Sequence, residues 1–482
     1  MANQIGNNIS GESYKYSLFN FLGLISKIVI SYLSIIFFFS LTARPNETAP
    51  QWSYFNLIYS CIIGIAFFYY FLIPELGYRG LTIVLGAFIF KLLLGTIHFV
   101  LFVQPQYFNG NSTYDFFMDY WWMHDSIEYM ANQAKEVGFA HSLTLEYFVV
   151  NKGAFIWYIL APIYYYGGSF ALNLCHMNSV FTIFTAIIVT FMAKNFWQLN
   201  RAQITTTLLL ASFFPFGLIT SCTMRDFAGQ TIIAIGMLFL QFTFKNKKLF
   251  PLIVIVCFLF FIVRKNYIVI PILAYLINLI ISFKKSKTNF NKAVNGGMIV
   301  LTSCIVYLGY LYQSILTQAD LIRTDLESQS TYSHDFTTIK FYLFLPIFIL
   351  KGFVGPFPWV QFFDFTQGTI YQPNDYFMAA FIYTSLILLV IKRKELKSLN
   401  FKNEIVITAS FIISFFGVAS GVMHLVYIAV PIIFFIPVIA SLFNTSSFLK
   451  IYSLVVLAFI ILSALWVLLG FYNSDVWGQF RN

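Results

Sequence analysis

Asp125, Glu128 and Tyr129 are spaced so that a helix would bring their side chains together. They belong to the run HDSIEYMANQA, which predicts a short helix, and residues three and four apart are neighbours on a helix surface. Two carboxylates on one face can serve as a general base with an orienting partner, or can bind a divalent cation. The alternative is a solvated helix whose acids face water. Spacing alone favours this alternative, because such pairs are common.

Three basic residues form a second set. Arg225 precedes Asp226 at one turn between apolar runs, and Arg264 and Lys265 form the turn of a later hairpin. Charges at membrane depth are costly and suggest function by default. Arginine can hold a phosphate through two hydrogen bonds, whereas lysine acts as a point charge. The alternatives, favoured for Arg225, are snorkelling to lipid headgroups and pairing with Asp226.

Other polar residues within apolar runs lack a catalytic or metal-binding pattern. Lys91 and His98 fall inside one run, and His176 lies near the start of another. An isolated histidine in this setting is more often a packed residue with satisfied nitrogens than a ligand, and no cluster has the spacing of a zinc site. The sequence also lacks a phosphate-binding loop, a dinucleotide-binding fingerprint and a nucleophile elbow.

Membrane helices are the elements that must position these residues. Of 482 residues, 59% are hydrophobic and only 10% are charged, whereas soluble domains carry about 25% charge. This composition excludes a soluble enzyme and a disordered chain. The five cysteines lie in or beside apolar runs, which excludes a secreted disulfide scaffold. Since a span needs about 20 apolar residues, we predict an all-α polytopic transmembrane helical bundle. About thirteen spans are expected, at roughly 18–42, 54–73, 80–103, 174–194, 202–222, 226–244, 249–263, 267–283, 293–315, 376–391, 403–421, 424–443 and 449–470.

Clusters of lysine and arginine predict the orientation, because short cytoplasmic loops are rich in both. Three clusters are assigned to the cytoplasm: Lys245/Lys247/Lys248, Lys284/Lys285/Lys287/Lys292 and Lys392/Arg393/Lys394/Lys397/Lys402. The N-terminus is then cytoplasmic, and the polar regions 104–173 and 316–375 face outward. The net charge of +10 is thus an orientation signal, and no nucleic-acid partner is expected.

Two apolar segments are predicted to stay at the outer surface. Counting 153–170 as a span would move the next lysine cluster to the wrong side, and Pro162 and Gly167-Gly168 interrupt it. We therefore expect a helix lying along the membrane surface. The same argument applies to 341–362, which contains Pro346, Gly355, Pro356 and Pro358. Irregular backbone at membrane depth needs protein or a water-filled cavity beside it, which predicts a roofed cavity on this side.

The order of these features resembles the GT-C superfamily of membrane glycosyltransferases, which includes the protein O-mannosyltransferases and the lipid A aminoarabinose transferases. The run from Asp125 is similar to that superfamily's Asp-Glu-x-x-Tyr-x-x-x-Ala-like motif, with Ser126 where Glu is common. The segment from Lys152 to the Gly167-Gly168 turn is similar to its Lys-Pro-Pro-Leu-like surface helix, although both prolines are missing.

Two basic turns complete the resemblance, which covers about 80–285. Arg225-Asp226 is similar to the superfamily's Arg/Asp outer turn, and Arg264-Lys265 to its Thr-Lys-Gly-like turn. The resemblance implies N-terminal accessory spans in 1–79, a catalytic module in 80–285 with outer loop 104–173, and C-terminal spans in 286–482. This last part is loosely similar to polysaccharide-repeat polymerases.

The resemblance implies glycosyl transfer in surface-polysaccharide biosynthesis, on the non-cytoplasmic face of a bacterial inner membrane. The donor would be a polyprenyl-phosphate- or diphosphate-linked sugar from the membrane lipid, and the acceptor a glycan or lipid. Asp125 and Glu128 would be catalytic, and no cofactor is implied beyond a divalent cation that these acids can hold. Substrate-binding roles would fall to Tyr129, Lys152, Arg225, Arg264 and Lys265.

A polysaccharide or lipid-oligosaccharide flippase is the alternative function, and a non-catalytic scaffold is another. Transporters often have internal repeats and ionisable residues near the bilayer midplane. The sequence has no clear repeat, and its charges concentrate at the outer ends of the predicted spans. These two observations favour the transferase.

The predicted orientation is tested by cysteine labelling. Single cysteines at Ser142, Ser328 and Ser474, in a background without native cysteines, should all react with a membrane-impermeant reagent added outside intact cells, because positive loops stay inside. Protection of the first two positions would reverse the orientation and move the acidic region to the cytoplasm.

Overall fold

The computed structural model describes residues 17–42, 50–100, 115–138, 154–197, 199–214, 226–263, 265–268, 270–272, 275, 372–392, 433–443 and 445–468. Within these parts of the chain all regular structure is helical, as the sequence predicts. Six of the described helices are long and apolar enough to cross a membrane. By length and composition these helices are those of a polytopic helical membrane protein.

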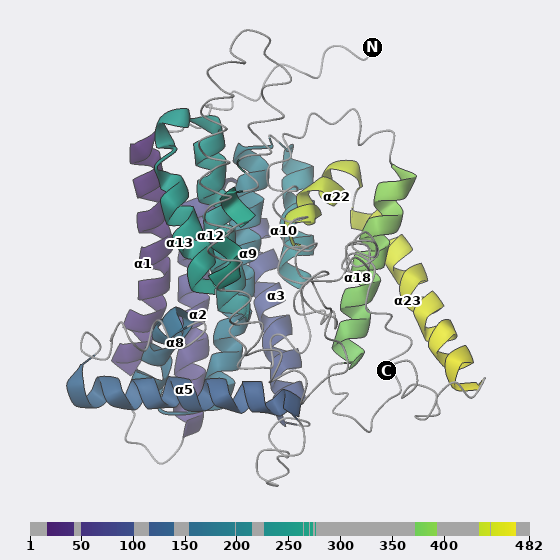
Figure 1. The fold of residues 1–482 in the computed structure, drawn as a ribbon. Helices are drawn as coiled ribbons and strands as arrows, with labels where there is room; N and C mark the ends of the chain where they lie inside the picture. The colour runs from purple at the N-terminus through teal and green to yellow at the C-terminus, as the bar shows by residue number, and fades with distance from the viewer. Residues whose placement is uncertain are drawn as a thin grey trace, which may run out of the picture.

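Helix α9 (Ala171–Asn195) is the centre of the bundle. Every residue from Ala171 to Ala193 is buried, which is typical of a helix enclosed by other helices on all sides. Helices α2, α3, α10 and α12 pack against it, while α1 packs on α2 and α13 on α12 (Figure 1). The bounds are α1 Leu18–Thr42, α2 Pro50–Leu72, α3 Gly77–His98, α10 Arg201–Phe213, α12 Asp226–Lys245 and α13 Leu252–Val263.

Helix α1 shows how the outer layer is built. Its buried residues form a narrow stripe: Phe21, Leu24, Ser31, Ile35 and Phe39. Large apolar side chains such as Phe19, Leu33 and Phe37 are exposed on its other faces. Such a continuous apolar exterior suits contact with lipid and not with water.

The helix bounds agree with most of the predicted spans that the structure describes. The spans predicted at 18–42, 54–73, 174–194 and 226–244 correspond closely to α1, α2, α9 and α12. The span predicted at 202–222 is described as a helix only to Phe213, in α10, and 215–225 lie outside the described residues.

The C-terminal helices form a smaller group beside α10. Helix α18 (Gln372–Ile391) packs on α23 (Thr445–Leu468), and α22 (Ile436–Leu442) connects this pair to α10 (Figure 1). Of the span predicted at 424–443, the structure describes a 3-10 turn, η6 (Ile433–Phe435), and the short α22. The predicted spans 293–315 and 403–421 and the surface segment 341–362 lie outside the described residues.

Helices α5 and α8 depart from the direction of the bundle. Helix α5 (Asp115–Val137) runs across the ends of α1, α2 and α3, and α8 (Ala154–Gly167) is seen close to end-on beside it (Figure 1). A steep inclination of α8 to α9 is what the sequence predicted for 153–170. We call this region the α5 end of the bundle, and the opposite end, where α9 reaches Asn195, the distal end.

A close approach between α1 and α2 occurs at Gly64. A Cβ atom at this position would lie 2.1 Å from Cγ1 and 2.7 Å from Cδ1 of Ile35. Small residues allow membrane helices to approach each other this closely, so the contact depends on the missing side chain.

Gly64→Ala should therefore destabilise the protein by about 1–3 kcal/mol, because the added methyl group overpacks the contact with Ile35. Gly86→Ala in α3 is the matched control. No described atom lies within 4 Å of its added methyl group, and alanine favours helices, so this change should be neutral or slightly stabilising. Thermal unfolding in detergent measures both variants. Equal melting temperatures for the two would contradict the close approach, and adding Ile35→Ala should recover part of the Gly64→Ala loss.

Candidate functional site

Helix α5 is amphipathic, and this decides which of its side chains face the protein. Its described buried residues recur every three or four positions: His124, Ile127, Met130, Ala131 and Ala134. Asp125 and Tyr129 lie on the exposed side and Glu128 at the boundary between the two faces. Gly138 ends the helix with a φ of 81°, and its N–H donates to the carbonyl of Ala134 at 2.9 Å. The apolar stripe thus fixes which way the acids point.

A contact between His124 and Tyr164 joins α5 to α8. The Tyr164 hydroxyl and His124 Nδ1 are 2.5 Å apart, and both side chains are buried. The two rings meet edge to face with centroids 5.4 Å apart. This contact orients the imidazole beside the acids that flank it on α5.

Helix α8 is itself held by α1. The Tyr32 hydroxyl donates a hydrogen bond to the carbonyl of Ile159. At the other end of α8, a Cβ atom on Gly167 would lie 2.4 Å from the Phe39 ring, and Gly168 follows with a φ of 78°. The two glycines predicted as a break therefore have separate roles, a close packing contact and a left-handed helix end.

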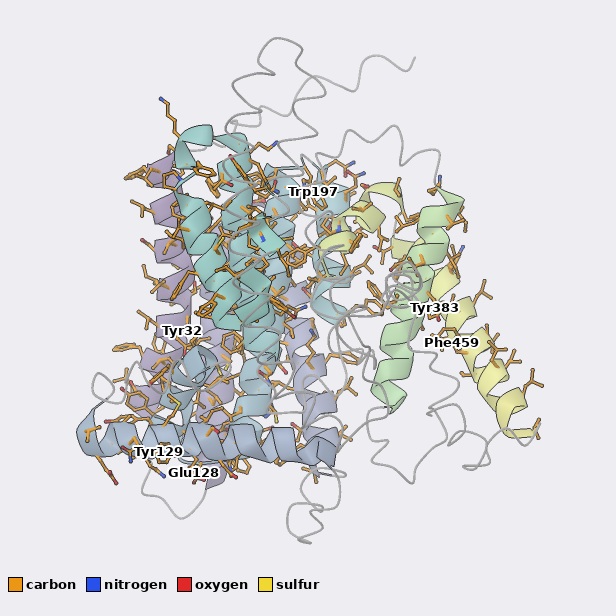
Figure 2. The ribbon with its side chains drawn as sticks, viewed as in Figure 1. Tyr32, Glu128, Tyr129, Trp197, Tyr383 and Phe459 are labelled. Atoms are coloured by element: carbon orange, nitrogen blue, oxygen red, sulfur yellow. The ribbon has the colours of Figure 1, made fainter. Side chains whose placement is uncertain are left out.

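His124, Asp125 and Glu128 form a cluster of three groups that can bind a metal ion. One ligand atom from each lies within 4.8 Å of the others. Figure 2 shows Glu128 and Tyr129 on α5, at the α5 end of the bundle. Asp125 is exposed and Tyr129 is 55% exposed, so the acidic side of the cluster is open to a ligand.

Burial and nearby negative charge shift the pKa of His124 in opposite directions. Burial lowers the pKa of His124 below its usual value of 6.5, and the nearby carboxylates of Glu128 and Asp125 only partly oppose this effect. The imidazole is therefore neutral at pH 7, which is the form that binds metal ions and accepts protons.

The structure describes only some of the predicted site residues. It brings Asp125, Glu128 and Tyr129 together on α5. The side chains of Lys152, Arg225, Arg264 and Lys265 lie outside the described residues. The backbone of Lys265 is described, and it starts a 3-10 turn, η4 (Lys265–Ile268), after α13. The turn follows α13, which contacts α8, and α8 in turn contacts α5, so α8 is the element that links this turn to the acidic helix.

Two site residues were not among the predicted ones. His124 lies four residues before Glu128, so its place on the same face could have been read from the spacing. Tyr164 could not have been found in this way, because it reaches the site from another helix, 40 residues along the chain.

A second polar feature crosses the middle of the bundle. Lys91 of α3 is fully buried, and its ammonium group donates to the Thr182 hydroxyl at 2.8 Å. Thr182 in turn donates to the carbonyl of Ser179. Among the described residues no carboxylate pairs with Lys91. A buried ammonium group without a counter-charge is costly in a membrane protein and suggests a functional role.

Buried polar side chains continue along α9 on both sides of this lysine. We call them the α9 polar seam: Asn173, His176, Asn178, Ser179, Thr182, Thr185 and Thr190. Thr185 shares a hydrogen bond with Thr231 of α12 at 2.9 Å. His176 packs on Tyr54 with ring centroids 4.8 Å apart, but its nitrogens have no hydrogen-bond partner in the described part of the chain. The sequence predicted that His176 is a packed residue with satisfied nitrogens. The packing is observed, but among the described residues neither ring nitrogen has a hydrogen-bond partner.

The neutral state of His124 predicts a pH dependence. Because the folded protein binds this proton more weakly than the unfolded chain, its contribution to stability is complete above about 6.5 and is lost as the pH falls below that value. With a chelator present, lowering the pH from about 7.5 to about 5.5 should reduce the melting temperature more in the native protein than in His124→Gln, which cannot take up the proton. The same pH dependence in both proteins would show that His124 is not held neutral.

No protein-family model matches the chain, and searches of the curated proteins and of the solved structures find no similar protein either. Function must therefore be argued from where the residues lie. What the structure offers is an acidic cluster with a neutral histidine at the α5 end, and a buried polar seam inside the bundle.

Proposed function

We propose that the protein is an integral membrane glycosyltransferase that uses a polyprenyl-phosphate- or diphosphate-linked sugar at the α5 end of the bundle. The proposal includes the GT-C-like architecture of about thirteen spans and a role in surface-polysaccharide biosynthesis, with the α5 end on the non-cytoplasmic face. One observation carries it. The carboxylates of exposed Asp125 and half-buried Glu128 lie on a helix across the ends of the membrane helices, where a lipid-borne donor and a water-borne acceptor can meet.

In this proposal Asp125 is the general base. It takes the proton from an acceptor hydroxyl as the oxygen forms a bond to the anomeric carbon of the sugar, while the bond from that carbon to the phosphate oxygen breaks. Glu128 lies beside it and stabilises positive charge that develops on the sugar ring. Tyr129 is exposed on the same face and is placed to contact the sugar.

The departing phosphate carries negative charge and needs fixed cations. Lys152, Arg225, Arg264 and Lys265 are assigned this role, since preorganised charges near a leaving group stabilise the transition state. Support for Lys265 is its position at η4, directly after the helix that contacts α8.

The cluster also suits a divalent cation. A neutral imidazole with two carboxylates is a common ligand set, and a ligating histidine usually has its second ring nitrogen in a hydrogen bond. Here Tyr164 engages Nδ1 of His124, so Nε2 is the nitrogen that would ligate, together with Asp125 and Glu128. A bound cation would supply positive charge to a phosphate or a sugar hydroxyl. Tyr164 would then orient the ligand histidine.

The α9 polar seam favours a second candidate, a lipid-oligosaccharide flippase or transporter. A buried Lys91 and a line of polar side chains in the bundle interior are typical of a path for a polar substrate. The two functions differ in where the donor lipid accumulates when the protein is lost. Loss of a transferase leaves it on the face where transfer takes place, whereas loss of a flippase leaves it on the face where it is made.

Asp125→Asn should reduce product by about 10²–10⁴-fold, because the amide keeps the shape of the base but cannot take the proton. The measurement is the yield of surface polysaccharide and lipid-linked intermediates in a deletion strain that carries each variant at matched membrane expression. Glu136→Gln is the matched control, since it removes one exposed charge from the same helix away from the cluster.

Two further variants make this experiment decisive. Asp119→Asn tests the neighbouring acid of α5, and Lys91→Met tests the buried seam. Full yield from Asp125→Asn with loss from Asp119→Asn would place the base one and a half turns away. Full yield from both acid variants, with loss from Lys91→Met, would favour the transporter.

A further inference from the structure

A groove at the distal end of the bundle has the features of a binding site for an anionic lipid. It lies where α3, α10 and α23 come together and has a volume of about 870 Å³. Its rim is basic and hydroxyl-rich, and its floor is apolar. The rim is formed by Arg79, Arg201, Thr205, Thr206, Thr445 and Ser446.

Among the described residues, no acid pairs with either arginine on this rim. Arg201 donates to the backbone carbonyl of Glu75 at 3.3 Å. The Glu75 carboxylate itself pairs with Lys194 at 2.8 Å. In the described part of the chain, neither Arg79 nor Arg201 forms an ion pair with a carboxylate. The rim therefore carries two positive charges that no carboxylate of the described residues pairs with.

Three helices also begin at this groove, which adds to its positive potential. Arg201 and Thr445 are the first residues of α10 and α23, and Arg79 is in the first turn of α3. The N-terminal ends of helices favour negative charge. The helix ends alone would not define a ligand, but here they coincide with two arginine side chains and a groove.

The floor explains why the ligand should be a lipid and not a small anion. Leu76, Ile83 and Leu209 line it, and Ile83 lies one helical turn deeper in α3 than Arg79. A phosphate on the rim would leave this apolar floor without a partner, whereas the first carbons of an acyl chain would cover it. Basic pockets between membrane helices typically bind the headgroups of anionic phospholipids.

We propose that this distal groove binds the phosphate of an anionic phospholipid between Arg79 and Arg201, with the lipid tail on Leu76, Ile83 and Leu209. A lipid at this position contacts α3 and α10 of the central bundle and α23 of the C-terminal group. The protein itself links α10 to α23 through a hydrogen bond of 3.1 Å between Thr206 and Thr445, and α10 to α22 through one of 3.0 Å from Gln203 to the carbonyl of Ser441. The bound lipid thus fastens the C-terminal helices to the bundle.

The test uses the full chain in nanodiscs or detergent, with phosphatidylglycerol and phosphatidylcholine as the probes. Native mass spectrometry should show tighter binding of phosphatidylglycerol, and this lipid should raise the melting temperature, since a ligand that binds only the folded state stabilises it. Arg79→Gln/Arg201→Gln should weaken phosphatidylglycerol binding by about 10- to 30-fold, because each basic residue near an anionic lipid contributes a several-fold preference. Lys248→Gln/Lys450→Gln is the matched control. It removes two exposed charges outside the groove and should bind like the native protein.

Three results would overturn the proposal. Equal binding of the two lipids to the native protein would mean that the groove does not select for charge. Equal losses in the two double variants would mean that total charge, not the groove, attracts the lipid. Full stabilisation by millimolar inorganic phosphate without lipid would identify a phosphate site instead. The comparison of lipids on the native protein remains decisive even if the arginine variant fails to fold.

Discussion

The complete burial of α9 is the constraint on which the bundle depends. The polar side chains of an enclosed helix depend on hydrogen bonds within that helix or from neighbouring helices, because lipid offers none. Lys91 of α3 and Thr231 of α12 meet hydroxyls of α9, and Ser53 of α2 accepts from Asn173 at 3.4 Å. These pairs constrain how α2, α3 and α12 are turned about α9, because rotation of either helix would break the hydrogen bond between them. The central polar contacts therefore determine how the helices are arranged around α9, and the apolar exterior suits the bundle to a lipid environment.

Helix α5 is positioned differently from α9, because it lies across the bundle with one face packed on the protein and the other exposed. Its apolar stripe packs on α8, and α8 is tied to α1 by Tyr32 and by the contact of Gly167 with Phe39. The acids of α5 are therefore positioned by a chain of contacts that leads back to the first helix. A cluster supported in this way is held in one orientation, which is a requirement for both metal binding and base catalysis.

Most of the described helices could be predicted from the sequence, because long apolar runs have few alternatives in a membrane. The sequence also predicts that the carboxylates of Asp125 and Glu128 lie on one face of a helix, because residues three apart are neighbours on a helix surface. The partner Tyr164 could not, because it depends on how α8 crosses α5. The full length of α5 was also missed, since the helix extends back to Asp115 through residues read as a polar loop. The groove around Arg79 and Arg201 could not be predicted, because it is formed by three helices that are distant in sequence.

The way α5 is attached has a consequence for local unfolding. Among the described elements its main neighbour is α8, whereas α9 has neighbours on every side. A segment with few neighbours opens with a smaller free energy than the whole protein, so we expect α5 to detach as a separate unit while the central helices stay folded. Its backbone amides should then exchange with solvent by this partial opening, and those of α9 only through global unfolding. The helix that carries Asp125 and Glu128 is thus expected to open without unfolding of α9.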